Sequence, residues 1–147
     1  MVGKMTKHFA YGSNLWFEQM DRRCPDNEPI DKGKLKDYRW IISSRGYANI
    51  VESKGDYVLG YVYELNPKDE KKLDDKEGAG DAYTKEYLKI EVDGEEYECL
   101  VYIDRKRTTE GKPWDEYVTR INNGVKDSLS DEDGYVEKYI RKFIDAD

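Results

Sequence analysis

Hydrophobic and polar residues alternate as in strands along the first part of the chain and take up a helical spacing near its end. The strongest alternation lies in residues 57–65, where large apolar side chains occupy every second position and valine or glycine fills most of the positions between them. A strand whose two faces are both largely apolar is covered on both sides. We therefore predict that residues 57–65 form a central strand.

Turn-forming residues separate the other predicted strands. Arg45-Gly46 and Lys54-Gly55-Asp56 each indicate a turn between two strands. Asp93-Gly94 indicates a tight hairpin, because both residues tolerate a positive φ angle. The strands expected from these boundaries cover residues 7–11, 38–43, 47–53, 57–65, 87–92 and 97–103.

Helices are expected after the first strand and after the central strand. The first helix is short and begins with Ser13 or Asn14 as its N-cap, since either side chain can accept a hydrogen bond from a helix N–H group that lacks a partner. The second begins at Asn66-Pro67, carries Leu73 inward and ends at Gly78.

Two more helices are expected near the end of the chain. After Pro113, apolar residues recur with the i, i+3, i+4, i+7 spacing of an amphipathic helix. Ser130 with Asp133 resembles a capping arrangement for a last helix. The residues expected to face inward are Trp114, Tyr117, Val118, Ile121 and Val125 in the first of these helices, and Tyr135, Val136, Tyr139, Ile140 and Phe143 in the second.

The composition indicates that tyrosine supplies much of the core. Charged residues make up 39% of the 147 residues and hydrophobic residues 37%. Leu, Ile, Val and Phe together come close to the roughly 20% below which a highly charged chain stays disordered. The 13 Tyr and 3 Trp residues add large bodies that can be buried with their polar atoms hydrogen-bonded. We therefore expect a single folded domain, residues 1–147, with a tyrosine-rich core.

The same sequence disfavours several classes of protein and of site. It has no apolar run long enough to span a membrane and no signal-peptide pattern, so we expect a cytoplasmic protein. Cys24, Cys99 and the single histidine, His8, are too few for a disulfide framework or a metal cluster. A net charge of −7 disfavours nucleic acid and anionic membranes as partners. A small molecule or a protein is the expected partner.

Two segments carry residue types that could bind an anion or move a proton. Residues 11–15, Tyr-Gly-Ser-Asn-Leu, place a glycine turn before a helix start, where backbone N–H groups can hold a carboxylate, a phosphate or an oxyanion. By its spacing alone this segment also fits the commoner case of a plain capped helix. Glu77 lies among acidic residues at the C-terminal end of a helix, where the helix dipole and burial would raise the pKa of a carboxyl group. The simpler interpretation is a solvated, charged helix.

Other candidate residues have simpler interpretations still. Tyr102, Trp114 and Tyr117 are more typical of core packing than of ligand contact. His8 is expected as a packed or surface strand residue. Neither cysteine has a histidine or a second cysteine near it in the sequence, so we expect no thiol nucleophile. With a single histidine in the chain, we also expect no Ser-His-Asp triad.

Taken together, these segments resemble the γ-glutamylcyclotransferase family in their order and spacing. The specific parts are the YGSN loop, within residues 9–15, and the LD..EG box, which is Leu73-Asp74 followed by Glu77-Gly78. Segments 33–39, 48–50 and 55–65 lie between these two parts, and Tyr102 and Tyr117 follow them. The resemblance covers residues 8 to 125.

The resemblance implies a fold and a site. The expected fold class is α+β, with a strongly curved, barrel-like mixed sheet, short flanking helices, a helical C-terminus and one cavity. In the family the YGSN-type loop holds the glutamyl head group through backbone N–H groups, and the acid of the EG box is the catalytic carboxylate, which here is Glu77. The implied substrate-binding residues are Tyr11, Gly12, Ser13, Asn14, Leu15 and, on the helix after the last strand, Tyr117.

The implied reaction uses a small γ-glutamyl compound and needs no metal and no cofactor. The α-amine of the substrate attacks its own γ-carbonyl while Glu77 acts as general acid and base, which yields 5-oxoproline and a free amine or amino acid. Asn14 stands where the glutathione-specific branch has leucine, so the chain resembles the general γ-glutamyl branch. The sequence leaves open which amine is released and whether the protein is a monomer or a homodimer.

Two other functions stay open at this point. One is a non-catalytic binding module for a γ-glutamyl or other carboxylate metabolite. An unpaired Glu77 carboxylate counts against it, because like charge weakens the binding of an anion. The other is an interaction protein that uses the acidic, helical C-terminus as its contact surface.

Overall fold

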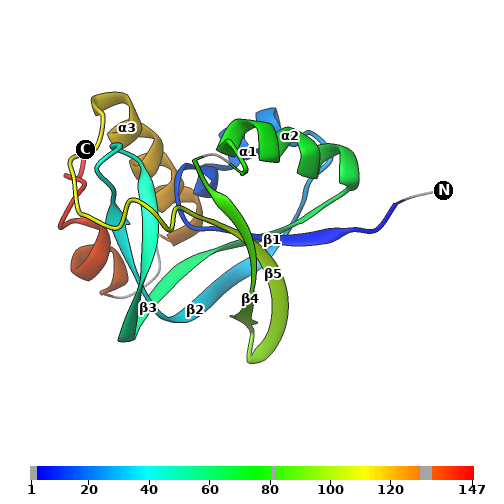
Figure 1. The fold of residues 1–147 in the computed structure, drawn as a ribbon, viewed down its shortest axis with the longest axis horizontal. Helices are drawn as coiled ribbons and strands as arrows, with labels where there is room; N and C mark the ends of the chain where they lie inside the picture. The colour runs from blue at the N-terminus through cyan, green and yellow to red at the C-terminus, as the bar shows by residue number, and fades with distance from the viewer. Residues whose placement is uncertain (1–2, 81, 130–133) are drawn as a thin grey trace.

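The computed structural model describes residues 3–80, 82–129 and 134–147, and its five strands close into a barrel (Figure 1). Neighbouring strands follow the order β1, β3, β2, β4, β5. β1 and β5 are parallel and the other neighbours antiparallel, so the curved, mixed sheet is confirmed. The strands are β1 Thr6–Ala10, β2 Glu28–Ile42, β3 Ala48–Leu65, β4 Thr84–Val92 and β5 Glu95–Ile103.

Strand β3 is the central strand that the apolar pattern predicts. It pairs with β1 on one edge and with β2 on the other. Val58, Val62 and Leu65 on this strand are fully buried. The hairpin between β4 and β5 is also confirmed, since Asp93 and Gly94 have φ angles of 50° and 83°, as a tight hairpin turn requires.

The turn predicted at residues 54–56 was wrong, because β3 runs unbroken through Gly55. The register between β2 and β3 shifts between Lys36 and Tyr38, where Asp37 alone faces residues 53–56, so β3 carries the extra residues of a bulge. Asp37 opposite this bulge has a φ angle of 66°, Gly55 within it has a φ angle of 89°, and Gly55 N donates a hydrogen bond to Asp37 Oδ1 over 3.0 Å. The turn-forming residues therefore bend the sheet at a bulge and do not end a strand.

Strand β2 also begins much earlier than residue 38, at Glu28. The added residues are mostly charged and exposed at the start of the strand, so they show no apolar alternation. Pairing with β3, which is apolar on both faces, makes them a strand. Tertiary pairing overrides local preference here.

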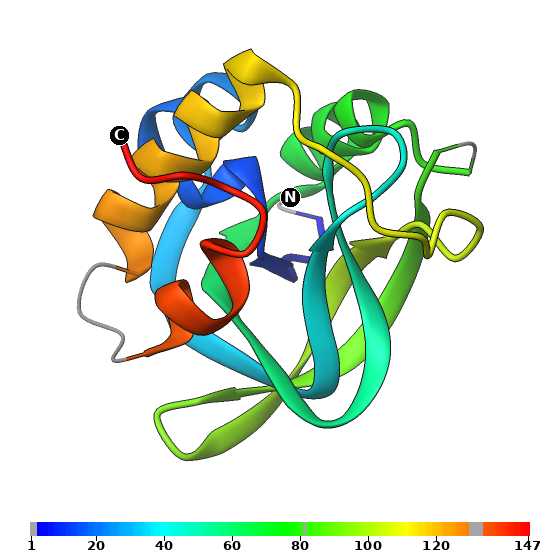
Figure 2. The same cartoon turned by 90° about the vertical axis from the view of Figure 1, so that its left-hand side faces the viewer.

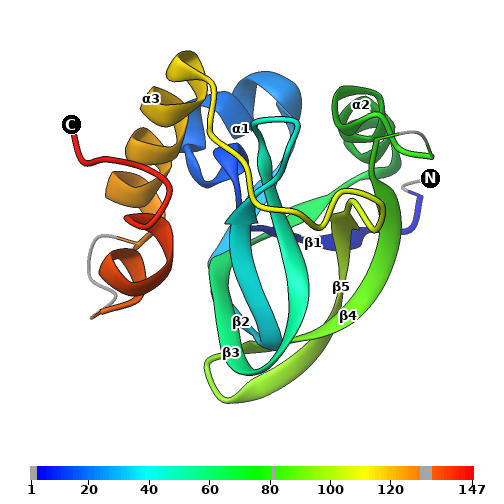
Figure 3. The ribbon, with the colours of Figure 1, turned by 60° about the vertical axis from the view of Figure 1, so that its left-hand side comes forward.

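Helices α1, α2 and α3 gather over one end of the barrel, and the C-terminal segment η3 packs against β2 (Figures 2 and 3). No helix among the described residues is long and apolar enough to cross a membrane. The α-helices are α1 Phe17–Arg23, α2 Pro67–Glu77 and α3 Asp115–Gly124. The part of the chain that the structure describes also has three shorter helical turns, a 3₁₀ turn η1 Ser13–Leu15 and two π-helical turns, η2 Val125–Leu129 and η3 Val136–Ile140.

Helix α2 has the predicted ends, whereas the predicted cap of the first helix was wrong. Asn66 caps α2 by accepting a hydrogen bond from Asp69 N, and Gly78 ends it with a φ angle of 62°. The first helix instead has Trp16 at its N-cap and no side-chain cap. Ser13 and Asn14 lie inside η1, where their side chains form hydrogen bonds with residues outside this turn. The proposed capping pair Ser130 and Asp133 lies outside the described residues.

Tyrosine contributes to the core as the composition predicts. Eight tyrosines are buried, and the expected inward residues Ile121, Val125 and Ile140 are buried with them. Trp114 is an exception at 61% exposed, so its inward placement was wrong. It precedes α3 as the N-cap residue, and its Nε1 donates to Arg45 O over 2.8 Å, which lays the ring over the loop between β2 and β3. The buried tyrosines are Tyr11, Tyr38, Tyr63, Tyr83, Tyr102, Tyr117, Tyr135 and Tyr139.

The chain's single histidine should make the fold sensitive to acid. His8 is 2% exposed, its Nδ1 lies 3.1 Å from Leu100 O, and its Nε2 has no partner in the described parts of the chain. Burial lowers its pKa from 6.5 to about 4. The unfolded chain therefore binds a proton that the folded chain does not, and stability falls as the pH drops through this window. We expect a loss of about 2 kcal/mol between about pH 8 and about pH 5 from this group, at about 1.36 kcal/mol per pKa unit.

Urea unfolding of the wild type and His8→Leu at a series of pH values measures this effect. The variant should lose less free energy of unfolding than the wild type as the pH falls, whatever its stability at neutral pH. Equal slopes for the two proteins would show that His8 does not titrate on unfolding.

Candidate active site

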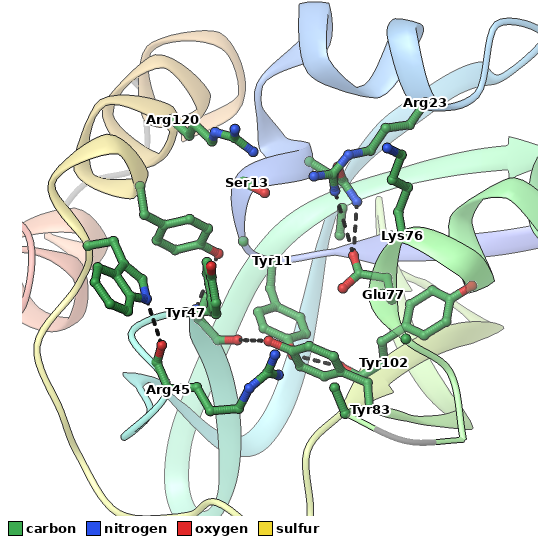
Figure 4. Close-up of a pocket in the computed structure, with 18 of the residues that line it drawn as sticks. Tyr11, Ser13, Arg23, Arg45, Tyr47, Lys76, Glu77, Tyr83, Tyr102 and Arg120 are labelled. Carbon is green, nitrogen blue, oxygen red and sulfur yellow. Dashed lines mark hydrogen bonds and ion pairs between the residues drawn. The ribbon is translucent and has the colours of Figure 1, made fainter.

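A cavity of about 980 Å³ lies between the gathered helices and the end of the barrel. Segments far apart in the sequence line it, as Figure 4 shows in part. The longest are the end of β1 with the start of the 11–15 loop, the C-terminal end of α2, the 43–47 loop between β2 and β3, and the first turns of α3, and Arg23, Tyr83 and Tyr102 add to the lining. The cavity therefore joins both motifs that the sequence singles out.

The carbonyl oxygens of the 11–15 loop are all occupied by donors of the protein. Because each of these carbonyl oxygens already accepts a hydrogen bond, a ligand bound to the backbone of this loop would meet N–H donors, which suit an anion or a carbonyl group. Leu15 N is not among them, since it donates to Gly12 O, and the Ser13 N–H faces the Tyr117 hydroxyl. The donors to the carbonyl oxygens are Trp40 Nε1 to Tyr11 O (2.8 Å), Leu15 N to Gly12 O (3.1 Å), Trp16 N to Ser13 O (3.1 Å), Tyr63 Oη to Asn14 O (2.8 Å) and Ser128 Oγ to Leu15 O (2.6 Å).

Gly12 allows two other elements to approach this loop closely. A Cβ atom at this position would lie 3.0 Å from Tyr117 Oη and 3.1 Å from Ala48 Cβ. The Tyr117 hydroxyl accepts a hydrogen bond from Ala48 N over 3.2 Å. Burial raises the pKa of Tyr117 to about 12, while hydrogen bonds from Ala48 and Ser13 act in the opposite direction. Tyr117 thus keeps its proton at neutral pH and fixes the loop against α3.

A chain of hydrogen bonds connects the 11–15 loop to the acid of α2. Gln19 Nε2 donates to Ser13 Oγ over 2.7 Å and to Asn14 Oδ1 over 3.0 Å, and Arg23 Nη1 donates to the same Asn14 oxygen over 3.0 Å. The other side of that amide, Asn14 Nδ2, donates to Glu77 Oε1 over 3.3 Å. These bonds orient the Asn14 amide so that its NH₂ group faces the carboxylate.

Glu77 occupies the last position of α2 and points into the cavity (Figure 4). Its side chain is 21% exposed, and the nearest cation, Arg23 Nη1, is 4.0 Å from Oε1. Desolvation raises the pKa of Glu77, and the charge of Arg23, the Asn14 hydrogen bond and the charge of Arg45 pull it down. The arrangement gives a carboxyl group that can hold or release a proton more readily near neutral pH than a solvated glutamate does.

Three tyrosines form the wall beside Glu77, and each hydroxyl has an acceptor. Tyr11 Oη donates to Tyr102 O over 2.6 Å, Tyr83 Oη to Ala48 O over 2.9 Å, and Tyr102 Oη to Asp74 Oδ1 over 2.6 Å. Burial raises the pKa of all three well above the usual range for tyrosine. These side chains therefore shape the cavity and stay neutral.

Most of the residues predicted for the site line this cavity. Tyr11, Gly12, Ser13, Asn14, Glu77 and Tyr117 all do so, and Tyr102 and Trp114 join them. Leu15 is placed elsewhere, since its side chain is fully buried and its N–H donates to Gly12 O. Sequence reasoning missed Arg23, Arg45 and Tyr83, which also line the cavity. The sequence indicated Arg45 only as part of a turn, and no sequence pattern indicated a role for Arg23 or Tyr83.

The described residues hold no group of three or more His, Cys, Asp or Glu side chains that could bind a metal ion. Cys24 and Cys99 are both fully buried as free thiols. Burial raises the pKa of Cys24 to about 12 and that of Cys99 to about 11. Thiols in this state are poor nucleophiles.

Comparisons with a family model and with known sequences agree on one family. The family model of gamma-glutamyl cyclotransferase, AIG2-like proteins matches residues 8–119. A gamma-glutamylcyclotransferase of Bos taurus is 31% identical over 115 residues, covering 68% of this chain and 60% of the relative. One of Homo sapiens is 31% identical over 111 residues, covering 65% and 57%. The chain thus spans about three fifths of the length of these two relatives.

Comparison with solved structures gives the same result. A structure of a gamma-glutamyl cyclotransferase is 27% identical, with a TM-score of 0.84 over 98% of this chain and 90% of the other. An uncharacterized protein from Homo sapiens is 28% identical, with a TM-score of 0.84 over 99% and 90%. These matches confirm the expected fold class. In sequence and in fold, the chain belongs to the γ-glutamyl cyclotransferase, AIG2-like family.

Proposed function

We propose that this chain is a γ-glutamyl cyclotransferase, which converts a γ-glutamyl compound into 5-oxoproline and a free amine or amino acid. The observation that carries the proposal is the 3.3 Å hydrogen bond from Asn14 Nδ2 to Glu77 Oε1. It joins a loop suited to an anionic head group to a partly buried carboxylate with a raised pKa. The names of the matched relatives support the same activity.

The substrate supplies its own nucleophile in this reaction. Its α-amine must reach its γ-carbonyl, and holding the two groups together can contribute roughly 7–11 kcal/mol to catalysis. The N–H groups of the 11–15 loop would hold the glutamyl head group or the oxyanion of the tetrahedral intermediate. Tyr11, Gly12, Ser13, Asn14 and Tyr117 are the binding residues in this proposal.

Glu77 is the general acid and base in the same proposal. It accepts a proton from the α-ammonium group, and the freed amine then attacks the γ-carbonyl carbon to close the five-membered ring. A proton passes to the leaving nitrogen as its bond to the carbonyl carbon breaks. A carboxyl group with a raised pKa serves both steps, because it gains and loses the proton near the working pH.

The test is a 5-oxoproline assay with a panel of γ-glutamyl amino acids and γ-glutamylamines. The matched control donors are α-glutamyl isomers, in which the amine has no activated γ-carbonyl to attack. Release of 5-oxoproline from γ donors alone would support the proposal. Binding of a non-cyclisable γ-glutamyl analogue, measured by calorimetry, with no product from any donor would instead support a non-catalytic binding module.

Arg23→Gln should move the acidic limb of the pH–rate profile to higher pH by about one unit, given the energy of a charge pair at this separation. The reason is that Arg23 lowers the pKa of Glu77, whose ionised form takes the proton. Without Arg23 the carboxylate therefore becomes protonated at a higher pH. The measurement is kcat/KM against pH, with Arg22→Gln as the control, since Arg22 is 66% exposed and pairs with Glu18. Coincident acidic limbs for wild type and Arg23→Gln would contradict this role.

A further inference from the structure

One arginine at the cavity has no acidic side chain in direct contact among the described residues, although the chain has an excess of acidic residues. Arg45, on the 43–47 loop, lines the cavity, and its guanidinium makes no ion pair with any described residue. The other two arginines of the cavity have partners. Arg23 donates to Asn14, and Arg120 donates to Gln19 and Glu116. Arg45 thus keeps the hydrogen-bonding capacity of its guanidinium for a ligand.

The 43–47 loop holds Arg45 in a fixed place. Ser43 N and Gly46 N donate to Tyr47 O and Ser43 O, both over 2.9 Å, and Trp114 Nε1 donates to Arg45 O over 2.8 Å. Gly46 has a φ angle of 88°, and a Cβ atom on it would lie 2.6 Å from the Trp114 ring. The backbone that carries Arg45 is therefore tied to the start of α3.

Aromatic rings hold the Arg45 side chain itself. Its guanidinium carbon lies 5.5 Å from the centre of the Tyr47 ring and 5.9 Å from that of Tyr83. Cation–π contacts of this kind orient a guanidinium without using its N–H groups. Tyr47 is 38% exposed and Trp114 is 61% exposed, so apolar surface flanks the cation at the opening of the cavity.

Figure 4 places Arg45 on the side of the cavity away from Arg23 and Lys76. Glu77 lies between these two sides, close to Arg23. A glutamyl group held by the 11–15 loop beside Glu77 would leave Arg45 and the exposed rings for the other half of the substrate. A planar guanidinium matches a carboxylate, to which it can donate two parallel hydrogen bonds.

We propose that Arg45 binds a carboxylate on the leaving amine, so that this protein prefers γ-glutamyl derivatives of amino acids or peptides to those of simple amines. The inference rests on the proposed cyclotransferase function and adds the choice of leaving group to it. Tyr47 and Trp114 flank the bound carboxylate and contact the apolar part of the leaving amino acid. Arg45 is a specificity-determining residue in this scheme: it neither gives nor accepts the proton, and its charge lowers the pKa of Glu77 whichever donor is bound.

Three matched donors test the inference, namely γ-glutamyl-leucine, γ-glutamyl-leucinamide and γ-glutamyl-3-methylbutylamine, which differ at the leaving carboxyl group. The wild type should show kcat/KM roughly 10- to 100-fold higher for the first donor, the usual range for a charged hydrogen bond. Arg45→Gln should remove this preference by lowering kcat/KM for γ-glutamyl-leucine much more than for the other two donors, since any effect of the lost charge on the pKa of Glu77 is common to all three. Arg45→Lys should restore part of it, and Arg22→Gln, which changes a charge outside the cavity, should keep the wild-type ratio.

The outcomes separate the possible failures. A wild type with the same kcat/KM for all three donors would overturn the inference. So would an Arg45→Gln variant whose kcat/KM falls by the same factor for all three, because Arg45 would then contact the glutamyl half of the substrate or stabilise the 43–47 loop. Circular dichroism melts show whether each variant is folded at the assay temperature. No 5-oxoproline from any donor would reject the cyclotransferase function itself, and the inference with it.

Discussion

Replacing Glu77 with glutamine should lower kcat/KM for 5-oxoproline release by roughly 10²- to 10⁴-fold, the usual contribution of a general acid or base. Glutamine has nearly the same shape and keeps an oxygen that can accept the 3.3 Å hydrogen bond from Asn14 Nδ2. It cannot accept a proton from the α-ammonium group of a substrate. The measurement is the initial rate on the best donor of the γ-glutamyl panel, for both proteins at the same pH.

The same substitution should leave the protein as stable as the wild type, or more stable, near neutral pH. Desolvation raises the pKa of Glu77 in the folded chain, so folding favours the protonated form. The stability from such a group is fully present below the pKa of the unfolded chain and is lost as the pH rises through the folded pKa. At neutral pH the ionised carboxylate therefore costs stability, and a neutral amide removes that cost. A thermal melt checks this, and a clear fall in Tm would assign the lost activity to unfolding.

Asp75→Asn is the matched control for Glu77→Gln. Asp75 lies on the same helix and also lines the cavity, but the hydrogen bond from Asn14 goes to Glu77. We expect Asp75→Asn to change kcat/KM little. Equal kcat/KM for Glu77→Gln and the wild type would show that Glu77 is not the general acid and base. A comparable fall in kcat/KM for Asp75→Asn would show that the effect is not specific to Glu77.

The sequence identifies the two ends of the site better than the contacts that join them. A glycine turn before a helix and an acid before a helix-ending glycine are local features, and both motifs line the cavity. The bridge from Gln19 and Arg23 through Asn14 to Glu77 connects residues that are far apart in the chain. Such contacts depend on how the helices close over the barrel, which residue spacing does not encode.

The difference between local features and long-range contacts also explains which parts of the fold were predicted wrongly from the sequence. Apolar alternation predicts β3, and Asp93-Gly94 predicts the β4–β5 hairpin, because each depends on neighbours in sequence. Lys54-Gly55-Asp56 has the composition of a turn, yet these residues form a bulge of β3 opposite Asp37, to whose Oδ1 Gly55 N donates a hydrogen bond. Trp114 fits the apolar stripe of α3, but its ring covers the 43–47 loop. In both cases a long-range contact determines what a locally ambiguous residue does.

Gly60→Ala should destabilise the fold by about 3 kcal/mol or more, the upper end of the usual cost of overpacking. A Cβ atom at Gly60 would lie 2.2 Å from Ala10 O and 2.8 Å from the Phe9 ring. The first of these atoms belongs to the backbone of β1, so the strand itself must move to relieve the collision. The free energy of unfolding in urea measures the cost.

Gly55→Ala separates this collision from the general cost of replacing a glycine. Gly55 lies on the same strand with a φ angle of 89° and no atom within 4 Å of an added Cβ, so we expect a loss of about 1–2 kcal/mol from backbone strain alone. Gly60 has no positive φ angle, and its larger cost would come from contact with β1. Because Ala10 leads directly into the 11–15 loop, any Gly60→Ala protein that still folds should also lose 5-oxoproline release. An unfolding free energy near that of Gly55→Ala would show that β1 can shift away from β3 at little cost.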